Sequence, residues 1–173
     1  MKDIWTYGYL DVEKFPWLPF VCLLGCLAAF WWLRYKIPKV PHSISATAYD
    51  RRSLFTEYCL MSSNFLSVLV LWEFINYTDD IELFGAFVSA QLLPWLARFW
   101  DFMGRHRVQH YILALLIFIP LIYWSGGLWW LVALMGVISF IGSRKKYKIF
   151  WTEAVILHLI IAYRLYLYYI WQG

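Results

Sequence analysis

Residues 15–33 read FPWLPFVCLLGCLAAFWWL, a stretch that contains no charged side chain. An α-helix rises about 1.5 Å per residue, so a stretch of this length nearly spans the roughly 30 Å hydrocarbon core of a bilayer. The segment before it, Met1 to Lys14, mixes acidic and basic residues and lacks the basic start of a signal peptide. We therefore expect residues 15–33 to stay in the protein as a membrane-crossing helix.

The composition of the whole chain agrees with that expectation. Of its 173 residues, 62% are hydrophobic and only 15% are charged, whereas a soluble domain carries roughly 25% charged residues. The net charge of +4 comes from Lys and Arg in short clusters between apolar runs, a pattern typical of membrane topology and not of a nucleic-acid partner. The sequence predicts one integral membrane domain, residues 1–173, whose main partner is the lipid bilayer.

Six apolar runs divide the chain, and they predict an all-α, polytopic transmembrane helix bundle. The fourth and fifth runs could instead form one overlong helix, but Ser125, Gly126 and Gly127 supply a turn between them. The six predicted spans are residues 15–33, 54–76, 82–100, 109–124, 127–142 and 149–171.

The charges of the connections predict the orientation of the bundle. Basic residues gather in the first, third and fifth connections, and such loops stay in the cytoplasm. The second connection is acidic, with Asp79 and Asp80. If residues 109–142 crossed the membrane once, the last basic cluster would lie outside. Six spans with both termini non-cytoplasmic, in a membrane such as the bacterial cytoplasmic membrane, fit every connection. The basic residues are Arg34, Lys36, Lys39, Arg51, Arg52, Arg98, Arg105, Arg107, Arg144, Lys145, Lys146 and Lys148.

Several polar residues fall near the cytoplasmic ends of these spans, and helix spacing extends the face of Glu57 to Asn64. A carboxylate that faces lipid is costly, so we expect such groups to turn inward. They would then share one polar pocket that opens to the cytoplasm, or, in the alternative, each would reach separately to the interface. The residues of the predicted pocket are Glu57, Asn64, Asp101, His110 and Glu153.

Two histidines in this region raise the question of a metal. His106 and His110 are four residues apart and share one face of a helix, where both could bind a divalent metal. The neighbouring Arg105 and Arg107 oppose cation binding, and a solvated helix end explains the pair as well. No cofactor is therefore predicted, and a divalent metal remains the alternative.

The segment PHSISATAYD, residues 41–50, lies in the longest internal connection. Its serines, Ser43 and Ser45, could belong to a site at the mouth of the pocket, and the candidate catalytic groups are then Ser43, Ser45, Asp101, His110 and Glu153. In the alternative, Thr47 and Asp50 cap the beginning of a helix that continues into the second span.

An ion pair is predicted nearer the other membrane face. Glu73 lies close to the end of the second span, and Arg164 lies deeper in the last span with a side chain long enough to reach it. Two opposite charges inside a membrane are expected to pair, and a structural role is the simpler interpretation.

Three short segments have counterparts in a known group of proteins: the P-x-S-I-S-A-T-x-Y segment at residues 41–49, Gln109-His110-Tyr111 and Trp151-Thr152-Glu153. The chain resembles a group of small, uncharacterised, polytopic bacterial membrane proteins that extends to phage-borne chains. It is remotely similar to the alkaline ceramidase-like membrane hydrolases, a resemblance that implies a zinc site of three histidines with a serine and an aspartate. The chain departs from that pattern, because it has one predicted span fewer and its last span holds only His158.

Three classes of function follow from these observations. The preferred one is a non-catalytic membrane protein that acts by assembly or interaction, such as an immunity, exclusion or permeabilising protein. Its partner would be a second copy or another membrane protein. The others are an intramembrane lipid-modifying hydrolase, which would be metal-assisted, and a small transporter or channel subunit.

Overall fold

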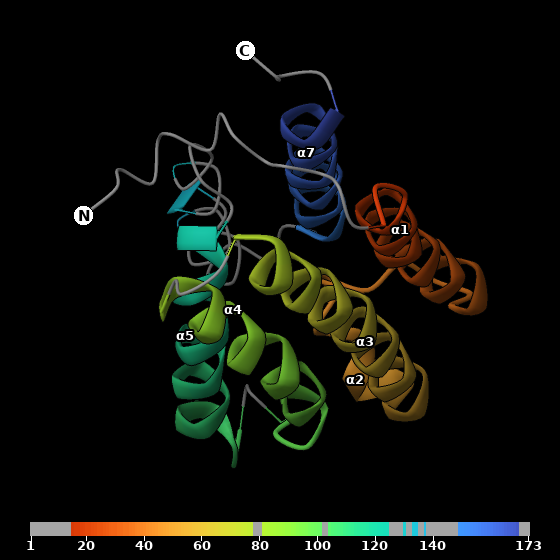
Figure 1. Ribbon diagram of the computed structural model, residues 1–173. Helices are drawn as coiled ribbons and strands as arrows, with labels where there is room; N and C mark the ends of the chain where they lie inside the picture. Colours follow the sequence, from red (N-terminus) through yellow and green to blue (C-terminus); the bar gives the residue numbers. More distant parts are fainter. Residues whose placement is uncertain are drawn as a thin grey trace.

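The computed structural model describes residues 15–77, 81–101, 104–124 and 149–169, together with residues 130, 133, 134 and 137. These residues are almost all helical and contain no strand, so the all-α prediction is confirmed (Figure 1). The elements are α1 (Leu18–Lys36), α2 (Thr47–Asp50), α3 (Arg52–Tyr77), α4 (Ile81–Leu92), the 3₁₀ helix η1 (Leu93–Ala97), α5 (Arg107–Trp124) and α7 (Phe150–Tyr169).

Four of the predicted spans coincide with single long helices. Spans 15–33, 54–76, 109–124 and 149–171 correspond to α1, α3, α5 and α7, with ends that differ by three residues or fewer. The predicted span 127–142 lies almost entirely outside the described residues.

The predicted third span is interrupted at Pro94. Helix α4 ends at Leu92 and the chain continues as η1, with proline in the first turn of the 3₁₀ helix. Proline has no N–H to donate and its ring crowds the preceding turn, so it ends or kinks an α-helix. The apolar run predicted as one span therefore folds as an α-helix followed by a 3₁₀ helix.

The ends of α1 follow directly from local sequence. Pro19 stands in the first turn, where its missing N–H is not needed, and the helix gives way to extended backbone at Ile37 just before Pro38. A residue before proline avoids the helical conformation. Arg34 and Lys36 lie in the last turn, where positive charge interacts favourably with the helix dipole.

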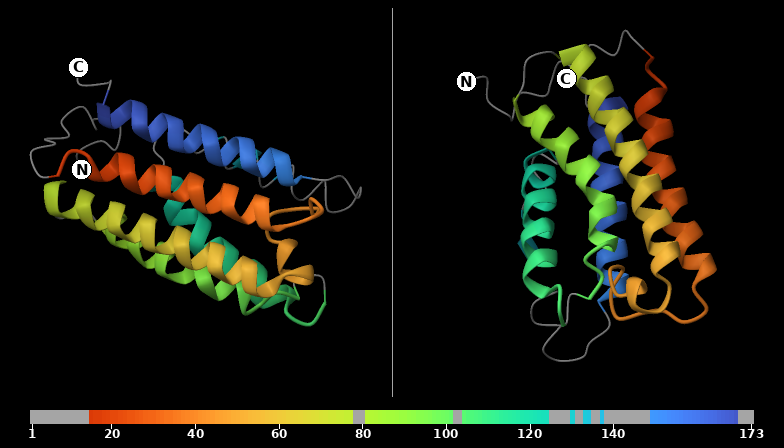
Figure 2. Two further views of the ribbon diagram at one scale, coloured as in Figure 1. Left: turned by 90° about the vertical axis from the view of Figure 1, so that its right-hand side faces the viewer. Right: turned by 90° about the horizontal axis from the view of Figure 1, so that it is seen from below.

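The helices form a bundle in which sequence neighbours pack together. Helix α1 packs against α3, α3 against α4 and α4 against α5, while α7 packs against α1. Successive helices run in opposite directions, and α7 runs antiparallel to α1 (Figure 2). The beginning of α1 and the end of α7 therefore lie at the same end of the bundle.

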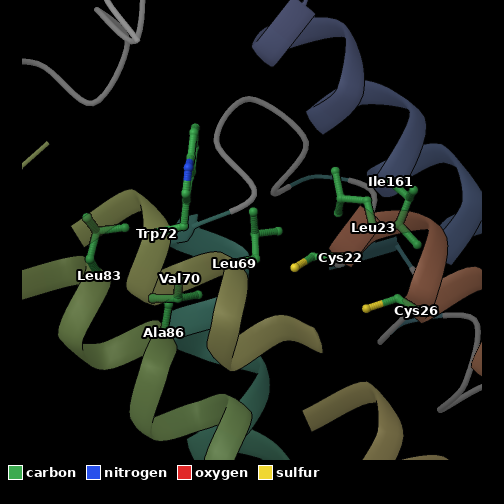
Figure 3. Close-up of a cluster of buried hydrophobic side chains, with 9 residues drawn as sticks. All are labelled: Cys22, Leu23, Cys26, Leu69, Val70, Trp72, Leu83, Ala86 and Ile161. Carbon is green, nitrogen blue, oxygen red and sulfur yellow. The ribbon is translucent and has the colours of Figure 1, made fainter. Parts of the chain in front are cut away.

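Apolar side chains from four helices meet in one buried cluster. Figure 3 shows this cluster, in which Cys22, Leu23 and Cys26 of α1 lie on one side of α3, near α7, and the members from α4 lie on the other side of α3. The approach of α1 to α3 is especially close at Gly25. A β-carbon at that position would overlap ring atoms of Phe65, so a larger residue fits only if that ring moves. The remaining members of the cluster are Leu69, Val70, Trp72, Leu83, Ala86 and Ile161.

Large apolar side chains also cover outward-facing surfaces of the bundle. Two described helices, α1 and the Arg52–Phe74 part of α3, are long and apolar enough to cross a membrane. Leu83–Ala97 and Arg107–Ile117 are apolar but shorter. Examples of exposed apolar residues are Phe20, Val21 and Leu24 of α1, Ile112, Leu115, Leu116 and Ile119 of α5, and Val155 and Leu159 of α7.

Candidate functional site

The beginning of α7 is capped by the connection between α1 and α3. The backbone N–H groups of Ile149 and Phe150 donate to the carbonyl oxygen of His42, at 2.8 and 3.0 Å. The first N–H groups of a helix have no partner within the helix, so an outside acceptor stabilises its start. The segment of residues 41–50 thus contacts the last helix, more than a hundred residues away in the sequence.

Glu153 makes the reciprocal contact from α7 back to the same segment. Its carboxylate accepts a hydrogen bond from the N–H of Ile44 at 2.7 Å. The carboxylate stands in the first turn of α7, where the helix dipole favours negative charge. A hydrogen bond to a carboxylate is stronger than one between neutral groups. Glu153 therefore holds the connection in position.

Ser43 and Ser45 lie in the turn that this contact fixes. Ser43 is buried, and its Oγ accepts the N–H of Ala46 at 3.0 Å, which stabilises the turn. Ser45 is half-buried. The predicted cap on Thr47 is wrong, because α2 begins there without a side-chain cap and ends at Asp50, one residue before Arg51 breaks the helix. The reason is that the turn in which Ser43 Oγ accepts the N–H of Ala46 already supplies a hydrogen-bond partner to the backbone just before α2.

A small hollow adjoins the same segment. Its volume is about 60 Å³, and it lies between the two prolines of the connection and the short helix α2. Its lining includes one lysine, one arginine and one aspartate. The lining residues are Ile37, Pro38, Lys39, Pro41, Thr47, Asp50 and Arg51.

Asp101 and His110 each engage the backbone around the start of α5. The Asp101 carboxylate accepts the N–H of Arg105 at 3.0 Å. His110 is buried, and its Nδ1 lies 3.1 Å from the carbonyl oxygen of Phe99. The ring of His106 packs edge-on against the ring of Phe99. Within the described residues, no group of three His, Cys, Asp or Glu side chains is arranged to hold a metal.

Glu57 and Asn64 lie on the outward face of α3. Both side chains are exposed, whereas Ser67, which the sequence pattern places on nearly the same face, is buried and accepts a hydrogen bond from Gln91. The structure therefore does not bring Glu57 and Asn64 into the interior. Glu153, His110 and Asp101 are buried or half-buried.

Glu73 and Arg164 form a buried ion pair between α3 and α7. Nη2 of Arg164 donates to both carboxylate oxygens of Glu73, at 2.9 and 3.3 Å. The contact is the one expected from the sequence. A buried charge pair of this kind holds two helices in one register, because removing either partner would leave a charge in a medium of low dielectric constant.

Two further contacts of α7 were not anticipated from the sequence. Nε1 of Trp31 donates to Nε2 of His158 at 3.1 Å. Near the other end, the hydroxyl of Tyr169 donates to the carbonyl of Pro16 and accepts the N–H of Phe20. At the proline-rich start of α1, backbone groups have no hydrogen-bond partner within the helix. This is the one sequence signal that could have indicated a polar partner there.

Helix α7 thus makes polar contacts at four levels along its length: at its start, at His158, at Arg164 and at Tyr169. In an apolar solvent, hydrogen bonds and close packing hold helices together, because burying apolar surface gains little there. Such a series of contacts fixes the depth and rotation of α7 against α1 and α3. The polar groups of the site therefore act by positioning α7 against its neighbours.

Comparison with known proteins finds no protein family, no curated protein and no solved structure that matches this chain. The resemblance drawn from the short segments therefore stays a prediction.

Proposed function

We propose that this chain is a non-catalytic integral membrane protein that acts through contact with other membrane proteins, in the class of assembly, immunity, exclusion or permeabilising proteins. One observation carries the proposal. The polar groups of Glu153, Asp101 and His110 contact backbone groups of the protein itself, while its outward helix faces are mostly apolar. Such a molecule presents its partners with a fixed apolar surface.

Several side chains that an intramembrane hydrolase would need contact backbone groups of the protein. The Glu153 carboxylate accepts the N–H of Ile44, the Asp101 carboxylate accepts the N–H of Arg105, and Nδ1 of His110 lies against the carbonyl oxygen of Phe99. A general base or a metal ligand needs a lone pair directed at substrate, water or metal. The backbone contacts of Glu153 and Asp101 favour a structural role for these two carboxylates.

The directions of the helices support six crossings. Helix α5 ends at the end of the bundle opposite to the start of α7 (Figure 2). A fifth crossing between α5 and α7 requires this placement of the two helices, and we propose residues 127–142 for that role. Both termini would then lie on the non-cytoplasmic side, with the basic connections in the cytoplasm of a bacterium.

Native mass spectrometry of the purified protein in mild detergent tests the proposed function. We expect bound lipid and no stoichiometric transition metal. His110→Ala should carry the same bound species as the wild type. A metal that is bound at one equivalent and lost in His110→Ala would overturn the proposal in favour of the metal-assisted hydrolase. Solute flux into proteoliposomes that exceeds the leak of empty vesicles and shows saturation would favour the transporter.

The membrane topology has its own test. Alkaline extraction should leave the protein in the membrane, and single introduced cysteines should report the sides. A cysteine at Lys39 should react only with reagents that enter the cytoplasm, and one at Asp79 should react from outside. Release of the chain by alkali would contradict the membrane assignment, and equal labelling of both positions from one side would contradict the six-span topology.

A further inference from the structure

The outward face of α3 carries a continuous stripe of side chains, which we call the α3 outer stripe. It consists of Leu60, Asn64, Val68 and Leu71, all exposed. Their spacings of four, four and three residues place them along one side of the helix. The three apolar members are 44–45% exposed, so none is covered by α1 or α4, which flank the helix (Figure 1).

Asn64 is the unusual member of this stripe. It lies twelve residues after Arg52 and thirteen before Tyr77, at the middle of the longest described helix. In the proposed membrane orientation its carboxamide stands near the centre of the hydrocarbon layer, where an unsatisfied amide is strongly unfavourable. The polar side chain therefore needs a partner at the same depth.

Three other polar side chains on the described helices have such partners. Ser67 and Ser89 each donate to the carbonyl four residues earlier, and Gln91 donates to Ser67. Among the described residues Asn64 makes no side-chain hydrogen bond, either to its own helix or to a neighbour. Its partner has to come from outside the described part of this chain.

We propose that the α3 outer stripe is the interface of a parallel homodimer, in which the Asn64 carboxamides of two copies hydrogen-bond to each other. A carboxamide is both donor and acceptor, so it is complementary to itself. Copies that insert in the same orientation place Asn64 at the same depth. A two-fold axis along the membrane normal then brings each Asn64 against its counterpart. This inference rests on the proposed membrane function.

The apolar members of the stripe fit the same geometry. Residues spaced by three or four positions line the seam between two parallel helices, and a single asparagine within such a seam fixes register and orientation. Leu60 and Val68 lie one turn on either side of Asn64. The contact ends at Glu57, two turns away from Asn64 toward the start of α3, where headgroup water can solvate two carboxylates.

Asn64→Leu is the direct test, since leucine keeps the size and removes donor and acceptor. The dimer fraction is measured by energy transfer between labelled copies in lipid vesicles at a series of protein-to-lipid ratios. We expect the dissociation constant to rise by about tenfold or more, with partial recovery in Asn64→Gln. The matched control is Leu115→Ala on the exposed face of α5, which should leave the constant unchanged.

Cross-linking provides a second measurement that does not depend on the stability of the variants. Val68→Cys should form a disulfide-linked dimer under mild oxidation, and Leu115→Cys should not. The natural cysteines are buried and serve as the background. A wild-type protein that is monomeric at every ratio, or equal cross-linking at both positions, would overturn the dimer.

The same experiments separate failure of the dimer from failure of the proposed function. A chain that resists alkaline extraction but is monomeric retains the membrane assignment and loses the homodimer. A chain that alkali releases loses both. Binding of a different membrane protein that depends on Asn64, without self-association, would contradict the homodimer while agreeing with the interaction function.

Discussion

Nη2 of Arg164 lies 2.9 Å from Oε1 of Glu73, and the two side chains are 1% and 2% exposed. The residues are far apart in the sequence, yet the contact joins α3 to α7. It is the most deeply buried of the polar contacts that position α7.

Replacing one member of this pair should destabilise the fold strongly. We expect Arg164→Met or Glu73→Leu to lower the free energy of unfolding by about 3–5 kcal/mol, because each leaves an uncompensated buried charge. The double variant should recover most of the loss. Denaturation in mixed micelles measures these values, with the exposed Glu57→Leu as control. Losses that simply add in the double variant would contradict a direct pair.

Glu153 is predicted to restrain the connection before α3. In Glu153→Leu the N–H of Ile44 loses a charge-assisted acceptor, at a cost of about 1.5–3 kcal/mol. The amide of Ile44 should exchange hydrogen faster than in the wild type, and Glu153→Gln should fall between the two. Glu57→Leu provides the comparison for a carboxylate lost elsewhere. Unchanged exchange at Ile44 would remove this role from Glu153.

A larger residue at Gly25 should weaken the packing of α1 against α3. A β-carbon in Gly25→Ala would overlap the ring of Phe65, and we expect a loss of about 1–3 kcal/mol in unfolding free energy. Phe65→Leu should relieve part of this loss. The matched control is Gly85→Ala, whose β-carbon would stand 3.6 Å from Pro120, an ordinary contact. Equal stability of the two alanine variants would show that α1 and α3 are further apart.

His158 should be neutral, with its proton on Nδ1. The indole N–H of Trp31 can only donate, so Nε2 of His158 has to accept. The protonated Nδ1 then donates to the carbonyl of Ala154 at 2.7 Å. Nitrogen NMR of the labelled imidazole distinguishes the two tautomers. In Trp31→Phe this preference should weaken, and an Nε2-protonated ring in the wild type would refute the contact.

Local sequence was sufficient for much of the fold. Pro38 and Pro94 mark a helix end and a change of helix type, and mainly apolar runs near the length of a bilayer crossing predicted α1, α3, α5 and α7. The candidate site could be predicted only in part. The pair of Glu73 and Arg164 was predictable, because opposite charges inside a membrane attract each other. Glu57 and Asn64 were expected inside because residues four and seven apart share a helix face, but periodicity does not say which face turns inward.

What the sequence determined by itself is therefore the helical class and the helix ends, because backbone hydrogen bonding, proline and apolar length act locally. Only the tertiary structure decided the partners. It placed the carbonyl of His42 on α7, gave Glu153 the N–H of Ile44 and left Asn64 outside. Such contacts depend on how helices far apart in sequence rotate and slide against one another, and that depends on packing at sites such as Gly25 and Phe65.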